Sequence, residues 1–109
     1  MKEKAQRYFH GPEGYNCAQA VLKIFQEHKD VLEETIEEFS AHGGGRAPHG
    51  YCGALHSVLY LADESLHDSI KEAFKTKTGS LNCKRIRVKG KVPCVECVRI
   101  ACEELQKKI

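Results

Sequence analysis

The sequence predicts an all-α fold, a compact array of about five helices with a glycine-rich loop. Apolar residues recur at spacings of three and four in several segments, which is the pattern of amphipathic helices. Residues typical of helix ends, Asn16, Gly79 and Pro93, lie beside those segments. At 109 residues the chain has the length of one domain, so residues 1–109 are expected to form a single helical unit.

Two helices are expected before the glycine-rich loop. Residues 16–28 carry one apolar stripe, made of Ala20, Val21, Ile24 and Phe25. Asn16 is suited to cap the start of this helix. Residues 31–39 continue at helical spacing, and Asp30 is a candidate cap for them. Three adjacent glycines and a proline in residues 42–50 then predict a loop.

Three further helices are expected after the loop. Residues 51–61 are almost wholly apolar and predict a buried helix. Residues 68–77 have an amphipathic pattern that Gly79 should end. The last helix is expected to begin at Pro93, because proline suits the first helical turn. Between positions 83 and 92 apolar and basic residues alternate, and the pattern assigns no element there.

Composition and charge exclude several classes of protein. With 41% hydrophobic and 29% charged residues, the chain has ordinary globular usage. The net charge of +2 does not indicate nucleic-acid binding, and the basic run at 84–91 has no interleaved aromatic residues, so a solvated loop is expected there. Residues 51–62 are too few to cross a bilayer, and the first fourteen residues lack the apolar core of a signal peptide. We therefore expect a cytoplasmic protein with no membrane insertion and no nucleic-acid partner.

Six cysteines are many for a chain expected in the cytosol, where structural disulfides are rare. Cysteines in such a chain more often bind a metal or carry out redox chemistry, and both tasks use the thiolate. Cys17, Cys52 and Cys94 each lie at the start of an expected helix, whose dipole should lower the thiol pKa. Cys83 precedes Lys84 and Arg85, whose charges should act in the same direction. The alternative is that these cysteines are small apolar core residues.

Three other residues lie at spacings that bear on this set. Cys97 lies three residues after Cys94, close enough on a helix to share a metal or form a dithiol. Cys102 lies about two turns beyond Cys94 and is expected in the core. His56 lies four residues after Cys52, where imidazole could bind a metal with the thiolate, although a core histidine is the commoner case.

The order of several short motifs resembles a known family. The motifs are GYNCAQAVL at 14–22, paired glycines at 43–44, CGA at 52–54, Gly79-Ser80 followed by Cys83, and Cys94. This arrangement, running from about residue 8 to 105, resembles the redox-active proteins of the C_GCAxxG_C_C family, whose cysteine pattern is C…CGAxxG…C…C. The resemblance implies a redox role, an association with iron–sulfur chemistry, and a shared function for Cys17, Cys52, Cys83 and Cys94. The chain departs from the pattern at Ser57, where the motif has glycine.

These observations lead to three hypotheses. In the first, Cys17, Cys52, Cys83 and Cys94 converge and hold an iron–sulfur cluster or other metal centre for electron transfer or redox sensing. In the second, the same four thiolates bind a structural zinc ion. In the third, the protein is a metal-free thiol–disulfide oxidoreductase in which Cys94 attacks and Cys97 or Cys83 resolves. A redox partner protein is the candidate partner, and the sequence leaves enzymatic activity and oligomeric state open.

Overall fold

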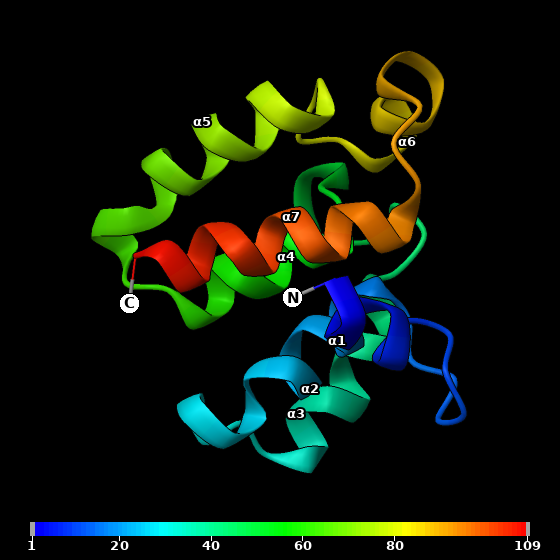
Figure 1. Ribbon diagram of the computed structural model, residues 1–109, viewed down its shortest axis with the longest axis vertical. Helices are drawn as coiled ribbons and strands as arrows, with labels where there is room; N and C mark the ends of the chain where they lie inside the picture. The colour runs from blue at the N-terminus through cyan, green and yellow to red at the C-terminus, as the bar shows by residue number, and fades with distance from the viewer. Residues whose placement is uncertain (1, 109) are drawn as a thin grey trace.

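The computed structural model describes residues 2–108, which form helices joined by short loops (Figure 1). The described α-helices are α1 (Lys2–Tyr8), α2 (Cys17–Lys29), α3 (Glu33–Glu38), α4 (Gly53–Leu61), α5 (His67–Thr78), α6 (Cys83–Arg85) and α7 (Cys94–Lys107). Shorter turns are the 3₁₀ segments η1 (Phe39–His42), η2 (Pro48–Gly50) and η3 (Glu64–Leu66) and the π turn η4 (Ile86–Gly90). No strand occurs within residues 2–108, so the predicted all-α class is confirmed.

The number of helices is seven among the described residues, against the five expected. The two additional helices are α1 and α6. In α1 only Ala5 is buried, so its sequence carries almost no apolar stripe. Helix α6 has only three residues and continues into the π turn. Both α1 and α6 are too short for their apolar residues to show a helical period.

Two predicted helix boundaries are wrong by two residues, and α7 begins at Cys94, one residue after the expected Pro93. Asp30 does not cap α3; it ends α2 in the left-handed conformation, with φ 51°, and Leu32 is the residue before α3. The buried helix α4 begins at Gly53 rather than at Tyr51, because Tyr51 instead forms an isolated antiparallel bridge with Asn82. Both differences arise from backbone interactions that hydrophobic periodicity does not record.

The start of α2 is fixed by its predicted cap, Asn16. The Asn16 side chain accepts a hydrogen bond of 2.9 Å from the Gln19 backbone N–H, and the Gln19 side chain accepts one of 3.1 Å from the Asn16 N–H. The Asn16 amide also donates to the carbonyls of Phe39 and Ser40, at 3.3 and 3.1 Å. This single residue therefore starts α2 and holds the segment that leads into the glycine-rich loop against it.

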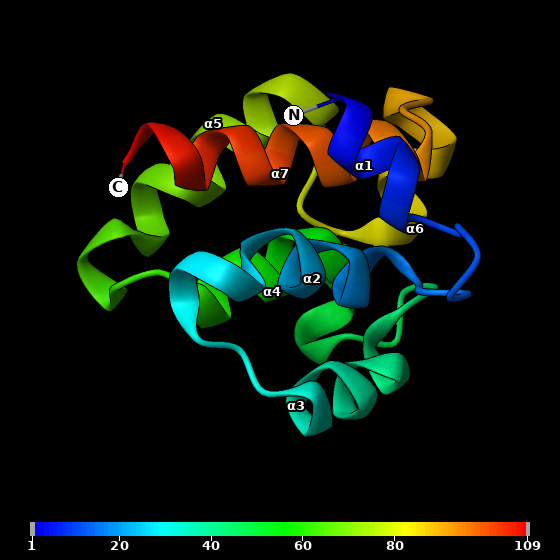
Figure 2. The ribbon, with the colours of Figure 1, turned by 60° about the horizontal axis from the view of Figure 1, so that its bottom comes forward.

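The core lies between α2, α4 and α7. Helix α4 packs against α2, and α7 packs against both, while α1 and α5 also contact α7 (Figure 2). The largest fully buried side chains include Phe74, Leu22, Ile36, Leu55, Ile70, Ile86 and Leu105. Helices α2, α4 and α7 begin at the same end of the molecule, where α6 also lies (Figure 2). Within residues 2–108 no helix is both long and apolar enough to cross a membrane.

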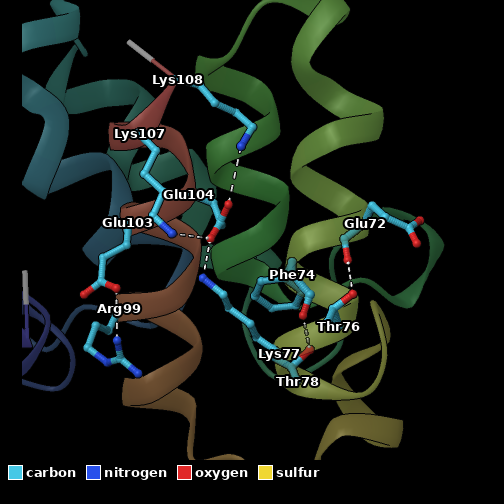
Figure 3. Close-up of polar contacts among 10 residues, drawn as sticks. All are labelled: Glu72, Phe74, Thr76, Lys77, Thr78, Arg99, Glu103, Glu104, Lys107 and Lys108. Carbon is cyan, nitrogen blue, oxygen red and sulfur yellow. Dashed lines mark hydrogen bonds and ion pairs between the residues drawn. The ribbon is translucent and has the colours of Figure 1, made fainter.

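A buried carboxylate joins α5 to the end of α7 (Figure 3). Glu104 is 3% exposed and accepts hydrogen bonds from Lys77 at 2.5 Å, Lys107 at 3.3 Å and Lys108 at 3.4 Å. Burial acts to raise the pKa of Glu104, but the hydrogen bonds from Lys77 and Lys107 outweigh it and hold the pKa at about 2. The carboxylate is therefore ionised throughout the physiological range.

Candidate thiol site

Five of the six cysteines line one small cavity where α2, α4 and α7 begin. Its lining residues are Cys17, Gly44, Cys52, Cys83, Ile86, Arg87, Val92, Cys94 and Cys97. The cavity volume is about 20 Å³, close to that needed for one water molecule. The predicted convergence of Cys17, Cys52, Cys83 and Cys94 is therefore present, although they come from four different helix starts. Their role as ligands stays a prediction.

Cys17 and Cys52 are brought together by the close packing of α2 on α4. Cys17 is the first residue of α2, and Cys52 precedes the first residue of α4, Gly53. A Cβ atom on Gly53 would lie 2.7 Å from the Cys17 Sγ and 2.6 Å from the carbonyl oxygen of His42. Only glycine leaves room for the Cys17 sulfur here, which gives the Cys-Gly-Ala sequence a direct structural reason.

Cys83 is held beside Cys52 by backbone pairing. The Cys52 N–H donates to the Leu81 carbonyl at 2.9 Å, next to the bridge between Tyr51 and Asn82. The Asn82 side chain then caps α6, accepting from the Lys84 N–H at 3.0 Å. The start of α6, which is Cys83 itself, is thereby fixed against the start of α4.

Cys94 is the accessible thiol of the group. It is half-buried at the start of α7, after Pro93, whereas Cys97 lies one turn further along and is 3% exposed. The Arg87 guanidinium donates to the Cys94 Sγ at 3.8 Å, and this hydrogen bond raises the pKa of Arg87. From the sequence, Arg87 was expected in a solvated basic run. Its place in the lining of the cavity was therefore not predicted.

The thiols of Cys17 and Cys52 resist ionisation, contrary to prediction. Side-chain hydrogen bonding with Cys52, followed by burial, raises the pKa of Cys17 far above its usual value, although the backbone N–H groups of Ala54 and Ala18 act to lower it. For Cys52, the hydrogen bond with Cys17 lowers the pKa, but the hydrogen bond with Cys97 and burial together raise it to about 12. The backbone N–H groups at the two helix starts lower the pKa values, as predicted, but burial and the hydrogen bonds from Cys17 to Cys52 and from Cys52 to Cys97 outweigh them.

Cys83 shows the same reversal for a different reason. Burial raises its pKa, while the charges of Arg87 and Lys84 act to lower it and are outweighed. The predicted lowering is therefore wrong for Cys17, Cys52 and Cys83. A sequence identifies helix starts and basic neighbours, but it does not show that several thiols share one buried space.

The other two candidates lie outside the cavity. The His56 ring packs against Phe39 and His42, with centroids 5.5 and 4.8 Å apart, and burial followed by the charges of His42 and His49 lowers its pKa. The structure thus does not bring His56 to the thiols. Cys102 is fully buried in the core, as predicted, where burial raises its thiol pKa.

The cavity fits a metal centre in its donor atoms but not in their present spacing. Cysteine sulfurs are the common ligands of iron–sulfur clusters and also suit zinc. Backbone N–H groups of Ala18, Ala54 and Leu55 bond to two of the sulfurs, Cys17 and Cys52, as donors around such centres do. Among residues 2–108, however, no three histidine, cysteine or acidic side chains are placed as a ready-made ligand set. The Cys52 thiol lies close enough to hydrogen-bond with the thiols of Cys17 and Cys97.

Comparison with known proteins identifies the family. Searches of curated proteins and of solved structures each found no match. A family model described as "Putative redox-active protein (C_GCAxxG_C_C)" matches residues 15–108, which is most of the chain and includes all six cysteines. The protein therefore belongs to the C_GCAxxG_C_C family of redox-active proteins.

Proposed function

We propose that the cavity is a redox centre in which Cys17, Cys52, Cys83 and Cys94 act together, and that their thiolates hold an iron–sulfur cluster for electron transfer or redox sensing. The observation that carries this proposal is the meeting of these four cysteines at one cavity from four helix starts. Four independent packing roles would not require them to meet. The cluster would supply the one-electron chemistry, and the protein would supply ligands and hydrogen-bond donors.

The electrostatics of the thiols support binding of a cation. A thiolate formed at Cys17 or Cys52 lies in a buried space beside other thiols. Its negative charge opposes ionisation of those neighbouring thiols unless a cation enters the cavity. A bound metal supplies that charge, and coordinated thiols lose their protons. The N–H groups of Ala54 and Leu55, at the start of α4, then remain as donors to the sulfurs and tune the centre. Loading should release protons and become more favourable as the pH rises.

A metal-free dithiol mechanism is the second candidate, supported by the thiol contacts and by the exposure of Cys94. The Cys94 thiolate, beside Arg87, would attack a substrate disulfide, forming a mixed disulfide and releasing one substrate thiolate. Cys97 or Cys83 would then attack the Cys94 sulfur, releasing the second thiolate and leaving a protein disulfide. One electron pair passes to the substrate.

Metal and sulfide analysis of anaerobically purified protein separates these functions. The proposal expects coloured protein with stoichiometric iron and acid-labile sulfide. It also expects loss of the colour in Cys52→Ser and its retention in Cys102→Ser, which alters a buried cysteine outside the cavity. Colourless protein that holds stoichiometric zinc would contradict the iron–sulfur proposal and support a structural zinc site. Protein with neither metal would contradict both.

Disulfide reduction tests the dithiol candidate separately. Metal-free reduced protein should reduce a small aromatic disulfide, and Cys94→Ser should lower the rate at least about tenfold. Cys97→Ser should allow the first attack but block turnover if Cys97 resolves. Equal rates in the original chain, Cys94→Ser and Cys97→Ser would remove this candidate.

A further inference from the structure

The turn beside the thiol cavity carries positive charges that pair with no carboxylate of residues 2–108. Between Glu72 and Glu96 the chain has no acidic residue. Five exposed basic residues lie in α6 and in the turn that joins it to α7, and we call this set the basic turn: Lys84, Arg85, Arg87, Lys89 and Lys91. None of the five forms an ion pair within residues 2–108, whereas Lys77, further back in the chain, pairs with Glu104.

The basic turn adjoins the accessible part of the cavity. It projects from the body of the molecule at the end where α7 begins (Figure 1). Arg87 both belongs to this turn and bonds to Cys94, the half-buried thiol. Next to it in the chain, Val88 is 74% exposed, between the basic residues Arg87 and Lys89. The surface therefore combines an apolar contact, a positive rim and a thiol of the candidate redox centre.

We propose that the basic turn is a docking surface for an acidic electron-transfer protein, which it brings next to Cys94. Complementary charge raises the rate of encounter between redox proteins, and their interfaces are small and transient. Val88 would lie at the centre of the contact, and the five cations would meet carboxylates around it. The basic turn itself contains no aromatic residue, but Tyr51 and His49 line a pocket together with Arg85 and Lys89, so single-stranded RNA is the alternative occupant that the test must separate. The electron exchange itself rests on the proposed function, but docking does not.

A pair of charge-reversal variants tests this surface. The double variant Arg85→Glu/Lys89→Glu reverses the charge of two members of the basic turn. Within residues 2–108 the side chains of these two residues form no hydrogen bond, so their replacement should not disturb the fold. The matched control, Lys2→Glu/Lys4→Glu, makes the same change in net charge at exposed positions of α1. Glutamate suits the start of a helix, so the control should fold normally.

The measurement is an NMR titration of the ¹⁵N-labelled full chain with an oxidised acidic flavodoxin as the probe. We expect shifts confined to residues 82–94, binding about tenfold weaker in the Arg85/Lys89 variant, and binding within twofold of the original in the control. Shifts spread over other faces, equal weakening in both variants, or binding of polyuridylate in place of flavodoxin would each overturn the proposal. The titration measures binding and involves no electron transfer, so protein without a metal would not contradict the docking proposal. Absence of binding would overturn the docking proposal but would not contradict the proposed redox centre.

Discussion

The Ser57 hydroxyl donates a hydrogen bond of 2.8 Å to the backbone carbonyl of Ala18, the residue that follows Cys17. Ser57 stands where the family motif has glycine, and it is fully buried between α4 and α2. Its hydroxyl is satisfied by the carbonyl, so the departure from the motif adds no unpaired polar group. The bond also ties the middle of α4 to the start of α2, where the thiol cavity lies.

Replacing Ser57 should show how much its hydrogen bond to Ala18 contributes to the free energy of unfolding. We expect Ser57→Ala to lower the free energy of unfolding by about 1 kcal/mol, since it removes a buried hydrogen bond but not the helix. Urea unfolding gives the value, and Ser69→Ala, an exposed position in α5, should change it by less than about 0.5 kcal/mol. Equal effects of the two substitutions would mean that the bond contributes nothing.

Adding one methyl group at Gly53 should disturb the thiols directly. Gly53→Ala places a Cβ against the Cys17 sulfur and the His42 carbonyl, so α2 and α4 must move apart. The expected loss is about 1–3 kcal/mol in urea unfolding, with faster alkylation of Cys17 measured by mass spectrometry.

Gly14→Ala is the control for Gly53→Ala. Apart from the adjacent residues in the chain, no described atom lies within 4 Å of the added Cβ at Gly14, but φ is 73° there, so backbone strain alone should cost about 1 kcal/mol. Faster Cys17 alkylation in this control as well would show that general loosening, and not the clash at Gly53, exposes the thiol.

Alkaline pH should destabilise the reduced, metal-free protein through the cavity thiols. The pKa of Cys52 is about 12 in the folded state against 9.0 for an unperturbed thiol, so above pH 9 the unfolded chain binds fewer protons than the folded one. The resulting stability is complete below pH 9 and is lost as the pH rises towards 12. The urea midpoint should therefore fall between pH 8 and 10.5, and it should fall less in Cys52→Ala. An identical fall in both proteins would contradict the assignment.

Acid should act through Glu104, at the opposite end of α7 from the thiols. Its folded pKa of about 2 lies below the unperturbed 4.5, so its contribution to stability is complete above pH 4.5 and is lost as the pH falls towards 2. Glu104→Gln should cost about 2 kcal/mol at pH 7 and flatten the decline in the urea midpoint below pH 4.5. An unchanged pH profile in the variant would show that other carboxylates govern acid unfolding.

Local sequence signals predicted the elements that are fixed locally. Asn16 caps α2 and Gly79 ends α5, since each choice depends on a few neighbouring residues. Asp30 is the counterexample, because the same residue type that caps a helix also tolerates the left-handed conformation that ends one. Helix α1 was missed because a single buried residue gives no period.

Four of the five cysteines that line the cavity were predictable from the sequence, whereas Cys97, Arg87 and the electrostatics of the thiols were not. Repeated placement at helix starts singled out the four cysteines, which do line one cavity. Whether Cys97 belonged could not be decided from its spacing, because one helical turn from Cys94 is compatible with either the cavity or the core. The raised pKa values of Cys17 and Cys52 follow from thiols in contact across different helices, and no local pattern records such contacts.

If Cys17, Cys52, Cys83 and Cys94 form one redox centre, as proposed, its oxidation and reduction must depend on all four residues. The most direct measurement is an anaerobic redox titration of the original chain and of serine variants at each of these four positions, with Cys102→Ser as the control. We expect one main transition, which is abolished or strongly shifted by each of the four substitutions and unchanged by Cys102→Ser. A transition that survives substitution of any two of the four, or that depends equally on Cys102, would contradict it.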